Sequence, residues 1–202
     1  MRLPSLFQFR ILKEAIKALF TGPYTSRFPK EPHVPFERFR GKPEFSKEDC
    51  VGCGACVQVC PSGALSMEDK GDKRILRIRW DICIFCGQCQ ANCLTEKGIT
   101  LSHEFDLATT EKREELRQDI DKELVLCQDC KEIIAPYEQI LWVAKRLGPL
   151  LFSNPSLMLF YLKTQQLSID QPVTGSKEKE FLRADRIRIL CPRCRREAVI
   201  KS

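Results

Sequence analysis

The run Cys50-x2-Cys53-x2-Cys56-x3-Cys60-Pro61 decides the fold of this chain, and it recurs as Cys83-x2-Cys86-x2-Cys89-x3-Cys93. Three thiolates at this spacing wrap one [4Fe–4S] cluster, and the fourth cysteine of each run reaches the cluster of the other run. We therefore predict two [4Fe–4S] clusters. The ligands of cluster 1 are predicted to be Cys50, Cys53, Cys56 and Cys93, and those of cluster 2 are predicted to be Cys83, Cys86, Cys89 and Cys60. The alternative is a set of structural or disulfide cysteines.

Composition favours metal ligation over a secreted disulfide scaffold. The chain has 202 residues, enough for one or two small domains, and 12 cysteines. All of these cysteines lie in tight Cys-x2-Cys or Cys-x3-Cys groups, and we expect no signal peptide. A reducing compartment fits best, so we expect the prokaryotic cytoplasm or the cytoplasmic face of the membrane. The net charge of +6 does not choose among nucleic acid, anionic lipid and acidic protein partners. No run reaches 18 apolar residues, so we expect no transmembrane helix.

Residues 47–105 read as an internal repeat, in which each half supplies a cluster loop, a short helix and a strand. The predicted strands are Leu65–Glu68, 74–80 and Ile99–Leu101. Leu94 stands where the repeat leads us to expect a second proline, which weakens the turn signal and leaves the ligand count intact. The predicted fold class is α+β, with a bacterial 2[4Fe–4S] ferredoxin-like domain at 47–105.

Residues 1–46 read as an N-terminal amphipathic helix followed by an extended docking arm. A wide apolar face over residues 5–20 is interrupted by Arg10, Lys13, Glu14 and Lys17. We favour a helix that lies on a membrane surface or a membrane partner over one packed on its own domain. Residues 23–46 are rich in proline, phenylalanine and arginine, which is typical of an arm laid over another protein.

Residues 106–202 read as a small metal-binding domain with four cysteine ligands. A solvated helix is expected at 106–123 because charged residues dominate there. Cys127-x2-Cys130 and Cys191-x2-Cys194 each lie between two apolar segments that we expect to be strands, and this pattern predicts a zinc-ribbon-like or rubredoxin-like domain. Four thiolates make a closed tetrahedral site for one mononuclear Zn, with Fe as the alternative. His33 and His103 lie far from both knuckles, and we expect neither to be a ligand. A helical insert is expected at about 136–168, either buried within the domain or used as a subunit-docking surface.

The chemistry expected of these sites is one-electron transfer. The sequence shows no nucleophile, acid–base pair or phosphate-binding glycine loop, so we expect a chain that is not an enzyme by itself. Gly52, Gly54 and Gly87 lie inside the cluster loops. Small residues there allow backbone N–H groups to approach the sulfurs, and such hydrogen bonds tune the reduction potential.

The cluster runs, the segment Phe39-Arg-Gly-Lys42 and the N-terminal helix together resemble a known family. They are similar to the two-cluster ferredoxin-like subunit of respiratory complex I and of membrane-bound, energy-converting nickel–iron hydrogenases, and Cys83-Ile-Phe-Cys-Gly87 is close to that family's second cluster motif. The added four-cysteine segment resembles the iron–sulfur subunit of formate hydrogenlyase, since complex I subunits generally lack it.

The resemblance implies an electron-transfer subunit on the cytoplasmic side of the membrane, held peripherally. Its implied partners are hydrogenase small and large subunits, membrane-arm subunits and an electron donor. That donor is a formate dehydrogenase module, a carbon monoxide dehydrogenase module or ferredoxin. The resemblance also implies strongly negative potentials for both clusters.

Three alternatives stay open. One is a subunit of a complex I-type quinone oxidoreductase, and another is a free-standing soluble ferredoxin, against which the apolar N-terminal helix argues. A remote one is a zinc-ribbon nucleic-acid-binding protein. Basic residues cluster at Arg193, Arg195, Arg196 and over 73–79, but no aromatic residues are interleaved to stack on bases, so we expect no nucleic-acid partner.

Overall fold

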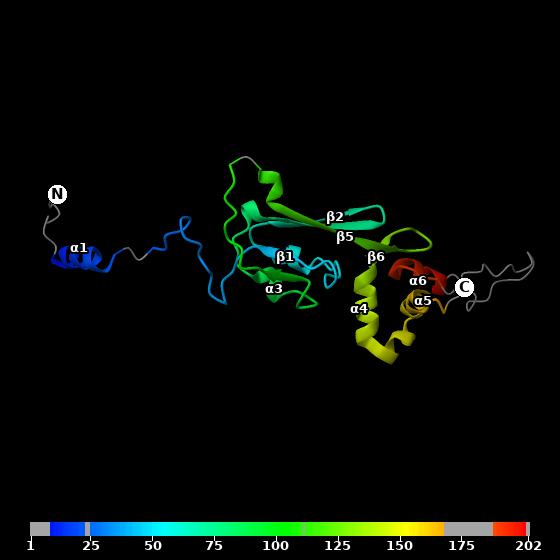
Figure 1. Ribbon diagram of the computed structural model, residues 1–202. Helices are drawn as coiled ribbons and strands as arrows, with labels where there is room; N and C mark the ends of the chain where they lie inside the picture. Colours follow the sequence, from blue (N-terminus) through cyan, green and yellow to red (C-terminus); the bar gives the residue numbers. More distant parts are fainter. Residues whose placement is uncertain (1–8, 23–24, 111, 168–187, 201–202) are drawn as a thin grey trace, which may run out of the picture. The chain divides into compact units, whose positions relative to one another are not determined.

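Two antiparallel sheets organise residues 40–202 (Figure 1). The computed structural model describes residues 9–22, 25–110, 112–167 and 188–200. The chain divides into two units, Met1–Phe39 and Arg40–Ser202. The helix found in the first unit is α1 (Phe9–Thr21), and the predicted residues 5–8 of that helix lie outside the described residues.

The smaller sheet joins the end of the predicted arm to the end of the cysteine repeat. Strand β1 (Pro43–Phe45) pairs with β4 (Ile99–Leu101), and Phe45 lies opposite Ile99. Two side chains satisfy the other edge of β1. The Gln118 side chain exchanges hydrogen bonds with the backbone N–H and C=O of Phe45, and Trp80 Nε1 donates to the carbonyl of Pro43 at 2.7 Å. Both sheets therefore share one core.

The larger sheet has the strand order β2-β3-β5-β6. Strands β2 (Leu65–Lys70) and β3 (Lys73–Arg79) form the predicted hairpin, and β6 (Ile133–Pro136) completes the far edge beside β5 (Arg117–Leu126). Alternate residues of β3 and β5 point inward and are buried, as apolar side chains on a half-buried sheet should be. The core contains Phe45, Leu65, Leu76, Ile78, Ile99 and Ile120 together with the buried cysteines Cys50, Cys56 and Cys89.

Strand β5 corrects one prediction. Residues 106–123 were expected to form a solvated helix, yet 113–115 form a 3₁₀ turn, η2 (Arg113–Glu115), and a strand begins at Arg117. The exposed Asp119, Asp121 and Glu123 alternate with the buried Ile120, Lys122 and Leu124, so the period is two residues and not 3.6. This strand pairs with β3 across the predicted domain boundary at 105/106.

Helices follow β6. The predicted insert consists of α4 (Tyr137–Leu147), η3 (Gly148–Ser153) and α5 (Pro155–Thr164). Asn154 caps α5 by accepting from the N–H groups of Ser156 and Leu157. The second ribbon half was predicted wrongly, because Cys191 leads into α6 (Pro192–Ile200) where a strand was expected. Within the described ranges, no helix is both long and apolar enough to cross a bilayer.

Candidate metal centres

Cluster loop 1 surrounds a cavity with about 310 Å³ of empty space. Its lining includes the four cysteines predicted for cluster 1, three from the first run and Cys93 from the second. Cys50 and Cys56 are buried, and Cys53 and Cys93 are half-buried. Leu76, Ile99 and Phe45 supply apolar walls. The structure therefore brings together cysteines that lie up to 43 residues apart in the chain, in a cavity that suits a thiolate-bound cluster.

Cluster loop 2 surrounds a second cavity, with about 360 Å³ of empty space. It is lined by Cys83, Cys86 and Cys89 of the second run and by Cys60 of the first. Leu65, Ile78 and Leu101 form part of its wall. Cys89 is buried, and the other three cysteines are half-buried. The crosswise grouping, three plus one in each cavity, is the arrangement that the spacing predicts. Ligation of each cluster by these residues remains a prediction.

Two glycines start the short helices that carry the middle of each cysteine run. Helix α2 (Ala55–Gln58) follows Gly54, and α3 (Gln88–Ala91) follows Gly87, with left-handed φ values of 78° and 79°. Side chains other than glycine rarely adopt this conformation. The left-handed residue turns the loop sharply and positions Cys56 and Cys89, which lie two residues later, at the buried wall of each cavity.

Hydroxyl groups and backbone amides surround the fourth cysteine of each run. Ser62 Oγ lies 3.7 Å from Cys60 Sγ, and Thr95 Oγ1 lies 3.5 Å from Cys93 Sγ. Burial acts to raise the pKa of Cys60 and Cys93, but the contacts with these hydroxyls and the hydrogen bonds from nearby backbone N–H groups outweigh burial and lower both pKa values. Such donors stabilise a thiolate ligand. The sequence analysis missed Ser62 and Thr95, although each stands two residues after the last cysteine of its run.

The remaining buried thiols behave in the opposite way. Burial raises the pKa of Cys56 to about 12 and that of Cys89 to about 11. These thiols hold their protons in the absence of iron, so cluster assembly has to release them. The donor set therefore fits a cluster whose iron ions supply positive charge. A cluster bound there would accept and release single electrons.

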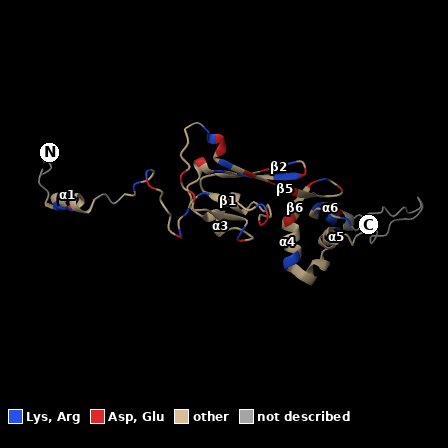
Figure 2. Cartoon of the chain, in the orientation of Figure 1, with Lys and Arg blue, Asp and Glu red and all other residues tan. Residues whose placement is uncertain are grey.

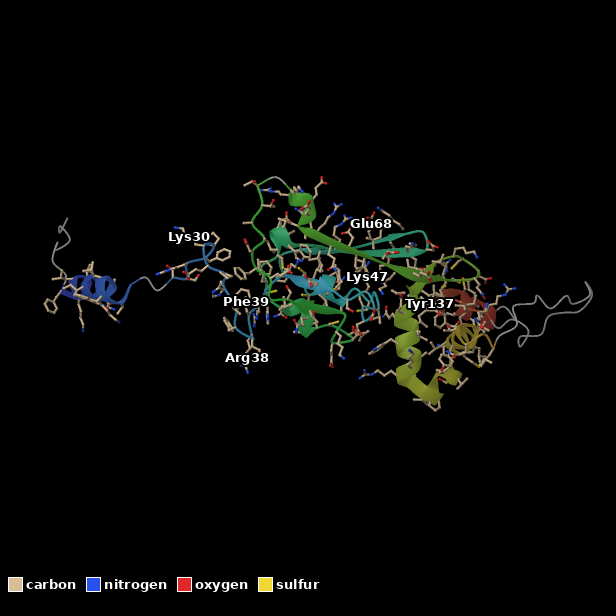
Figure 3. The ribbon with its side chains drawn as sticks, viewed as in Figure 1. Lys30, Arg38, Phe39, Lys47, Glu68 and Tyr137 are labelled. Carbon is tan, nitrogen blue, oxygen red and sulfur yellow. The ribbon has the colours of Figure 1, made fainter. Side chains whose placement is uncertain are left out.

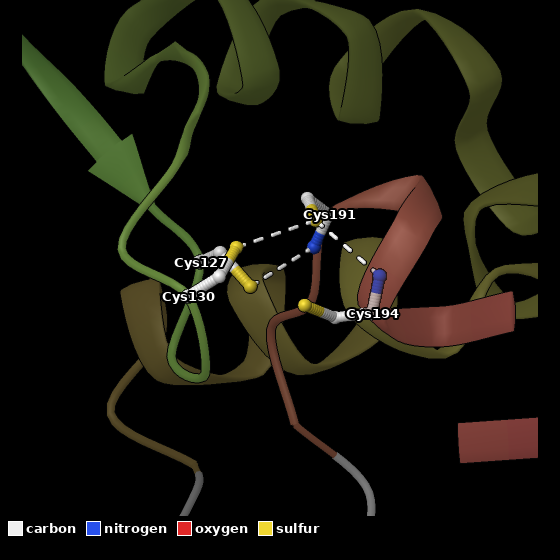
Figure 4. Close-up of side chains that lie close together, drawn as sticks. All are labelled: Cys127, Cys130, Cys191 and Cys194. Atoms are coloured by element: carbon white, nitrogen blue, oxygen red, sulfur yellow. Dashed lines mark hydrogen bonds between the residues drawn. The ribbon is translucent and has the colours of Figure 1, made fainter. Parts of the chain in front are cut away.

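The second predicted centre is also assembled (Figure 4). The sulfurs of Cys127, Cys130, Cys191 and Cys194 all lie within 4.8 Å of one another, and Sγ of Cys130 lies 3.7 Å from Sγ of Cys191. A tetrahedral site with metal–sulfur bonds of about 2.3 Å places its sulfurs about 3.8 Å apart. The four thiols therefore fit one tetrahedral metal ion, and the choice between zinc and iron stays open.

Backbone donors prepare this site for thiolates. The N–H of Cys191 donates to Cys127 Sγ at 3.3 Å, and the N–H of Cys194 donates to Cys191 Sγ at 3.4 Å (Figure 4). Burial acts to raise the pKa of Cys127, but the N–H groups of Cys191, Cys130 and Asp129 lower it to about 6. The hydrogen bond with Cys130 raises the pKa of Cys194, so metal binding there has to release a proton. A thiolate is the form that binds a metal, so this geometry favours ligation. A metal ion bound by all four thiols would have no open position, so such a site would be structural and closed to substrate.

Two basic residues near cavity 1 were also missed. Lys122 is buried at 6% exposure, and Arg74 lies directly opposite it on β3. The signal that locates Lys122 is its place among the inward-facing residues of β5, but a strand had first to be recognised there. Neither residue belongs to a known cysteine motif.

The fold and the paired cavities define a class, the dicluster ferredoxin-like electron-transfer proteins. Residues 36–97 match the 4Fe–4S dicluster domain family. Formate hydrogenlyase subunit 6 of Escherichia coli is 39% identical over 135 residues, which cover 65% of this chain and 72% of that protein. NADH-quinone oxidoreductase subunit I 2 of Geobacter metallireducens is 35% identical over 114 residues, covering 52% and 86%.

A solved structure of the membrane-bound sulfane sulfur reductase, an archaeal respiratory membrane complex, contains a chain that is 28% identical. The match covers 57% of this chain and 62% of that one, with a TM-score of 0.39. The sequence relatives show the family: this chain belongs to the complex I chain I-like 4Fe–4S subunits, which are electron-transfer components of oxidoreductase complexes and not enzymes by themselves.

Proposed function

We propose that this chain relays electrons through two [4Fe–4S] clusters to the small subunit of a membrane-bound nickel–iron hydrogenase of the formate hydrogenlyase type. The electrons come from a donor module, which is a formate dehydrogenase, a carbon monoxide dehydrogenase or ferredoxin. The observation that carries the relay is the crosswise grouping of cysteines around the two cavities. Similarity to formate hydrogenlyase subunit 6 over 135 residues supports the choice of complex.

The two cavities adjoin the same strand, which supports electron transfer between bound clusters. Leu76 lines the first cavity and Ile78 lines the second. Both belong to the inward face of β3 and stand two residues apart, which is about 7 Å along a strand. Bound clusters would supply one-electron redox chemistry, while the cysteines hold them and the apolar walls exclude water. No residue needs to form a bond with substrate.

Helix α1 supports attachment to a membrane surface or a membrane-arm subunit. Each residue of Phe9–Thr21 is exposed, including Phe9 at 85%, Leu19 at 81% and Phe20 at 83%. Large apolar side chains on a helix that also carries Arg10, Lys13 and Lys17 are typical of helices that lie at an interface. We place the subunit peripherally on the cytoplasmic side of the membrane, with the four-cysteine site occupied by one structural Zn, or alternatively Fe.

Anaerobic purification of the full chain tests the relay. We expect about eight irons and eight sulfides per chain, because each [4Fe–4S] cluster contains four of each. Cys53→Ser should perturb one cluster and Cys86→Ser the other, whereas Cys130→Ser should leave both intact. Colourless protein with far less sulfide would overturn the proposal. Redox titration followed by EPR would contradict the low-potential assignment if both centres were reduced above about −150 mV.

Native extracts test the partners. Co-elution of the chain with nickel on size exclusion is expected for a hydrogenase complex. Elution of the chain alone, near its mass of 23.3 kDa, would indicate a free carrier. The second candidate is a complex I-type quinone oxidoreductase, because the match covers 86% of the Geobacter metallireducens subunit. A large complex without nickel would favour that candidate.

A further inference from the structure

A buried lysine lies against the loop of cavity 1. Among the described residues, Lys122 is the charged side chain with the deepest burial, and its side chain is only 7% exposed. Its ammonium donates to the carbonyl of Lys47 at 2.7 Å and lies 3.4 Å from Glu138 Oε1. Burial of a lysine is costly unless its charge is compensated. Figure 3 labels Lys47, and also Tyr137, which precedes Glu138 at the start of α4.

The aliphatic stem of Lys122 packs on the cluster loop itself. A Cβ added to Gly52 would lie 3.1 Å from Lys122 Cγ. Gly52 stands between Cys50 and Cys53, two residues of the cavity 1 lining. The Lys122 side chain therefore lies against the backbone between two predicted ligands of cluster 1.

A second cation stands directly across the sheet. Arg74 pairs with Lys122 in the register of β3 and β5, and its Nη1 donates to the carbonyl of Gly52 at 3.1 Å. Asp69 accepts two hydrogen bonds from the same guanidinium, at 2.7 and 2.9 Å. Like charges directly opposite each other destabilise a sheet. Asp69 and Glu138 offset part of that cost, and a cluster with four thiolates would supply further negative charge close to both cations.

The cation pair is closer to one cavity than to the other. Along the inward face of β3, Ile78 lines cavity 2, Leu76 lines cavity 1, and Arg74 follows. Cavity 2 has Arg40, whose Nη1 donates to the carbonyl of Cys86 at 3.1 Å, but this side chain is exposed. Water and salt screen an exposed charge far more than a buried one. Figure 2 shows that basic and acidic residues are otherwise interspersed along this sheet.

We propose that Lys122 and Arg74 raise the reduction potential of the cluster held by Cys50, Cys53, Cys56 and Cys93, so that an electron shared between the two clusters favours this one. The inference rests on the proposed ligand assignment. One-electron reduction adds one negative charge to a thiolate-bound cluster, and a fixed buried cation stabilises that added charge. Glu138 and Asp69 partly oppose the effect. The Oε2 atom of Glu138 is buried and has no hydrogen-bond partner among the described residues.

Redox titration of the anaerobically purified full chain, followed by EPR, tests the proposal. Cys53→Ser identifies the signal of cluster 1. Lys122→Met keeps the length of the stem and removes the charge. We expect the equilibrium constant for reduction of cluster 1 to fall about tenfold, which lowers its reduction potential by about 59 mV for one electron. The potential of cluster 2 should shift less. Lys122→Arg keeps the positive charge and should leave the reduction potential of cluster 1 at its wild-type value.

The direction of the shift in the reduction potential of cluster 1 distinguishes an electrostatic effect from a general disturbance of packing. Glu138→Gln removes the opposing carboxylate and should raise the potential of cluster 1, whereas loose packing has no reason to reverse direction. The matched control is Lys73→Met, which removes an exposed lysine, at 53% side-chain exposure, from β3 and should leave both potentials unchanged. If Lys122→Met does not fold, Arg74→Gln and Glu138→Gln carry the same test with opposite signs.

The result that overturns the inference is two intact clusters whose potentials do not respond to Lys122→Met, or respond equally to Lys73→Met. Equal shifts in the same direction for Lys122→Met and Glu138→Gln would also overturn it. Failure of the proposed function looks different, because the wild-type chain would then contain no pair of clusters to titrate.

Discussion

Gly98 shows how one missing side chain positions two predicted ligands of the same cluster. A Cβ at this residue would lie 2.8 Å from Thr95 Oγ1, 3.1 Å from the Cα of Cys50 and 3.2 Å from Cys93 Sγ. The backbone of Gly98 also donates to Thr95 Oγ1 at 3.0 Å, and that hydroxyl donates to the carbonyl of Asp49. The two cysteine runs therefore meet at this glycine, although the ligand motifs do not include it.

We predict that Gly98→Ala reduces occupancy of cluster 1 and spares cluster 2. The added methyl group has to displace Thr95 Oγ1 and also crowds Cys50 and Cys93, and overpacking of this kind costs about 1–3 kcal/mol. Iron and sulfide analysis with EPR measures the loss. Gly71→Ala, in the turn between β2 and β3, is the control for general strain, because its φ of 61° disfavours a side chain while nothing lies within 4 Å of a Cβ there. Equal cluster content in both variants would show that the contact is unimportant.

Asp119 makes acid stability testable at the residue scale. Two hydrogen bonds from Arg77, at 2.9 and 2.8 Å, lower the pKa of this carboxyl. Because the pKa in the folded state is below that in the unfolded state, the stabilisation is present above the unfolded pKa of about 4 and is lost as the pH falls through the folded value. We predict that wild type exceeds Asp119→Asn in stability at pH 6 and that the gap narrows progressively as the pH falls below about 4. Thermal unfolding of both proteins at each pH measures it, and a constant gap would refute the pairing.

At the scale of elements, β5 is the strand that the sequence analysis missed. Ile120 is 4% exposed and faces the core, whereas Glu123 is exposed on the outer face of the strand. We predict that Ile120→Ala costs about 2–5 kcal/mol of unfolding free energy, while Glu123→Ala changes it by no more than about 0.5 kcal/mol. Denaturant unfolding under anaerobic conditions measures both. Similar small effects would instead fit the solvated helix first expected here.

Helix α1 carries the second prediction at this scale. Leu12→Glu combined with Ile16→Glu places charge on its apolar face, where burial of each side chain is worth about 1.5–3 kcal/mol. We expect association with membranes or with the complex to weaken by about 100-fold or more. Flotation with vesicles and co-purification measure this. Glu14→Gln, on the polar face, is the control, and retained association in the double variant would remove α1 from the docking surface.

At the scale of the whole molecule, the four-cysteine site ties the end of the chain to the rest of the second unit. The backbone N–H of Leu190 donates to Ser156 Oγ at 3.0 Å, and that of Ile189 donates to Gln128 Oε1 at 2.9 Å. These bonds hold residues 188–200 against α5 and the loop that follows β5, and a metal bound by the four thiols would strengthen the link. A metal bound at this site would cross-link two segments that 60 residues separate in the sequence.

We predict that Cys191→Ser, or removal of the metal by a chelator, increases proteolytic cleavage within 188–200 by roughly tenfold or more while both clusters remain. Limited proteolysis and metal analysis of the same samples measure the two effects, and the analysis also decides between zinc and iron. Arg188→Ala, which removes only the exposed ion pair with Asp129, is the control. Loss of the clusters along with the metal would show that the two centres depend on each other.

Spacing within short segments was enough to predict the local structure of this chain. Two runs of four cysteines, the strands that follow them and the exposed amphipathic helix could be predicted because each depends on spacing within a few residues. The grouping of Cys60 with Cys83, Cys86 and Cys89 also followed, since the repeat implies it. The second set of four cysteines was found from its paired knuckles, although the helix after Cys191 was not.

The folded structure was needed to show which residues from distant parts of the chain surround the predicted cluster sites. Lys122 resembles any surface lysine in a charged segment until β5 pairs with β3 and turns it toward Arg74 and the loop at Gly52. Strand pairing joins residues far apart in the chain, and the free energy that selects it comes from burying Ile120 and Leu76 together. Periodicity within one segment carries no information about that partner, so the charges beside cluster 1 could be recognised only in the folded chain.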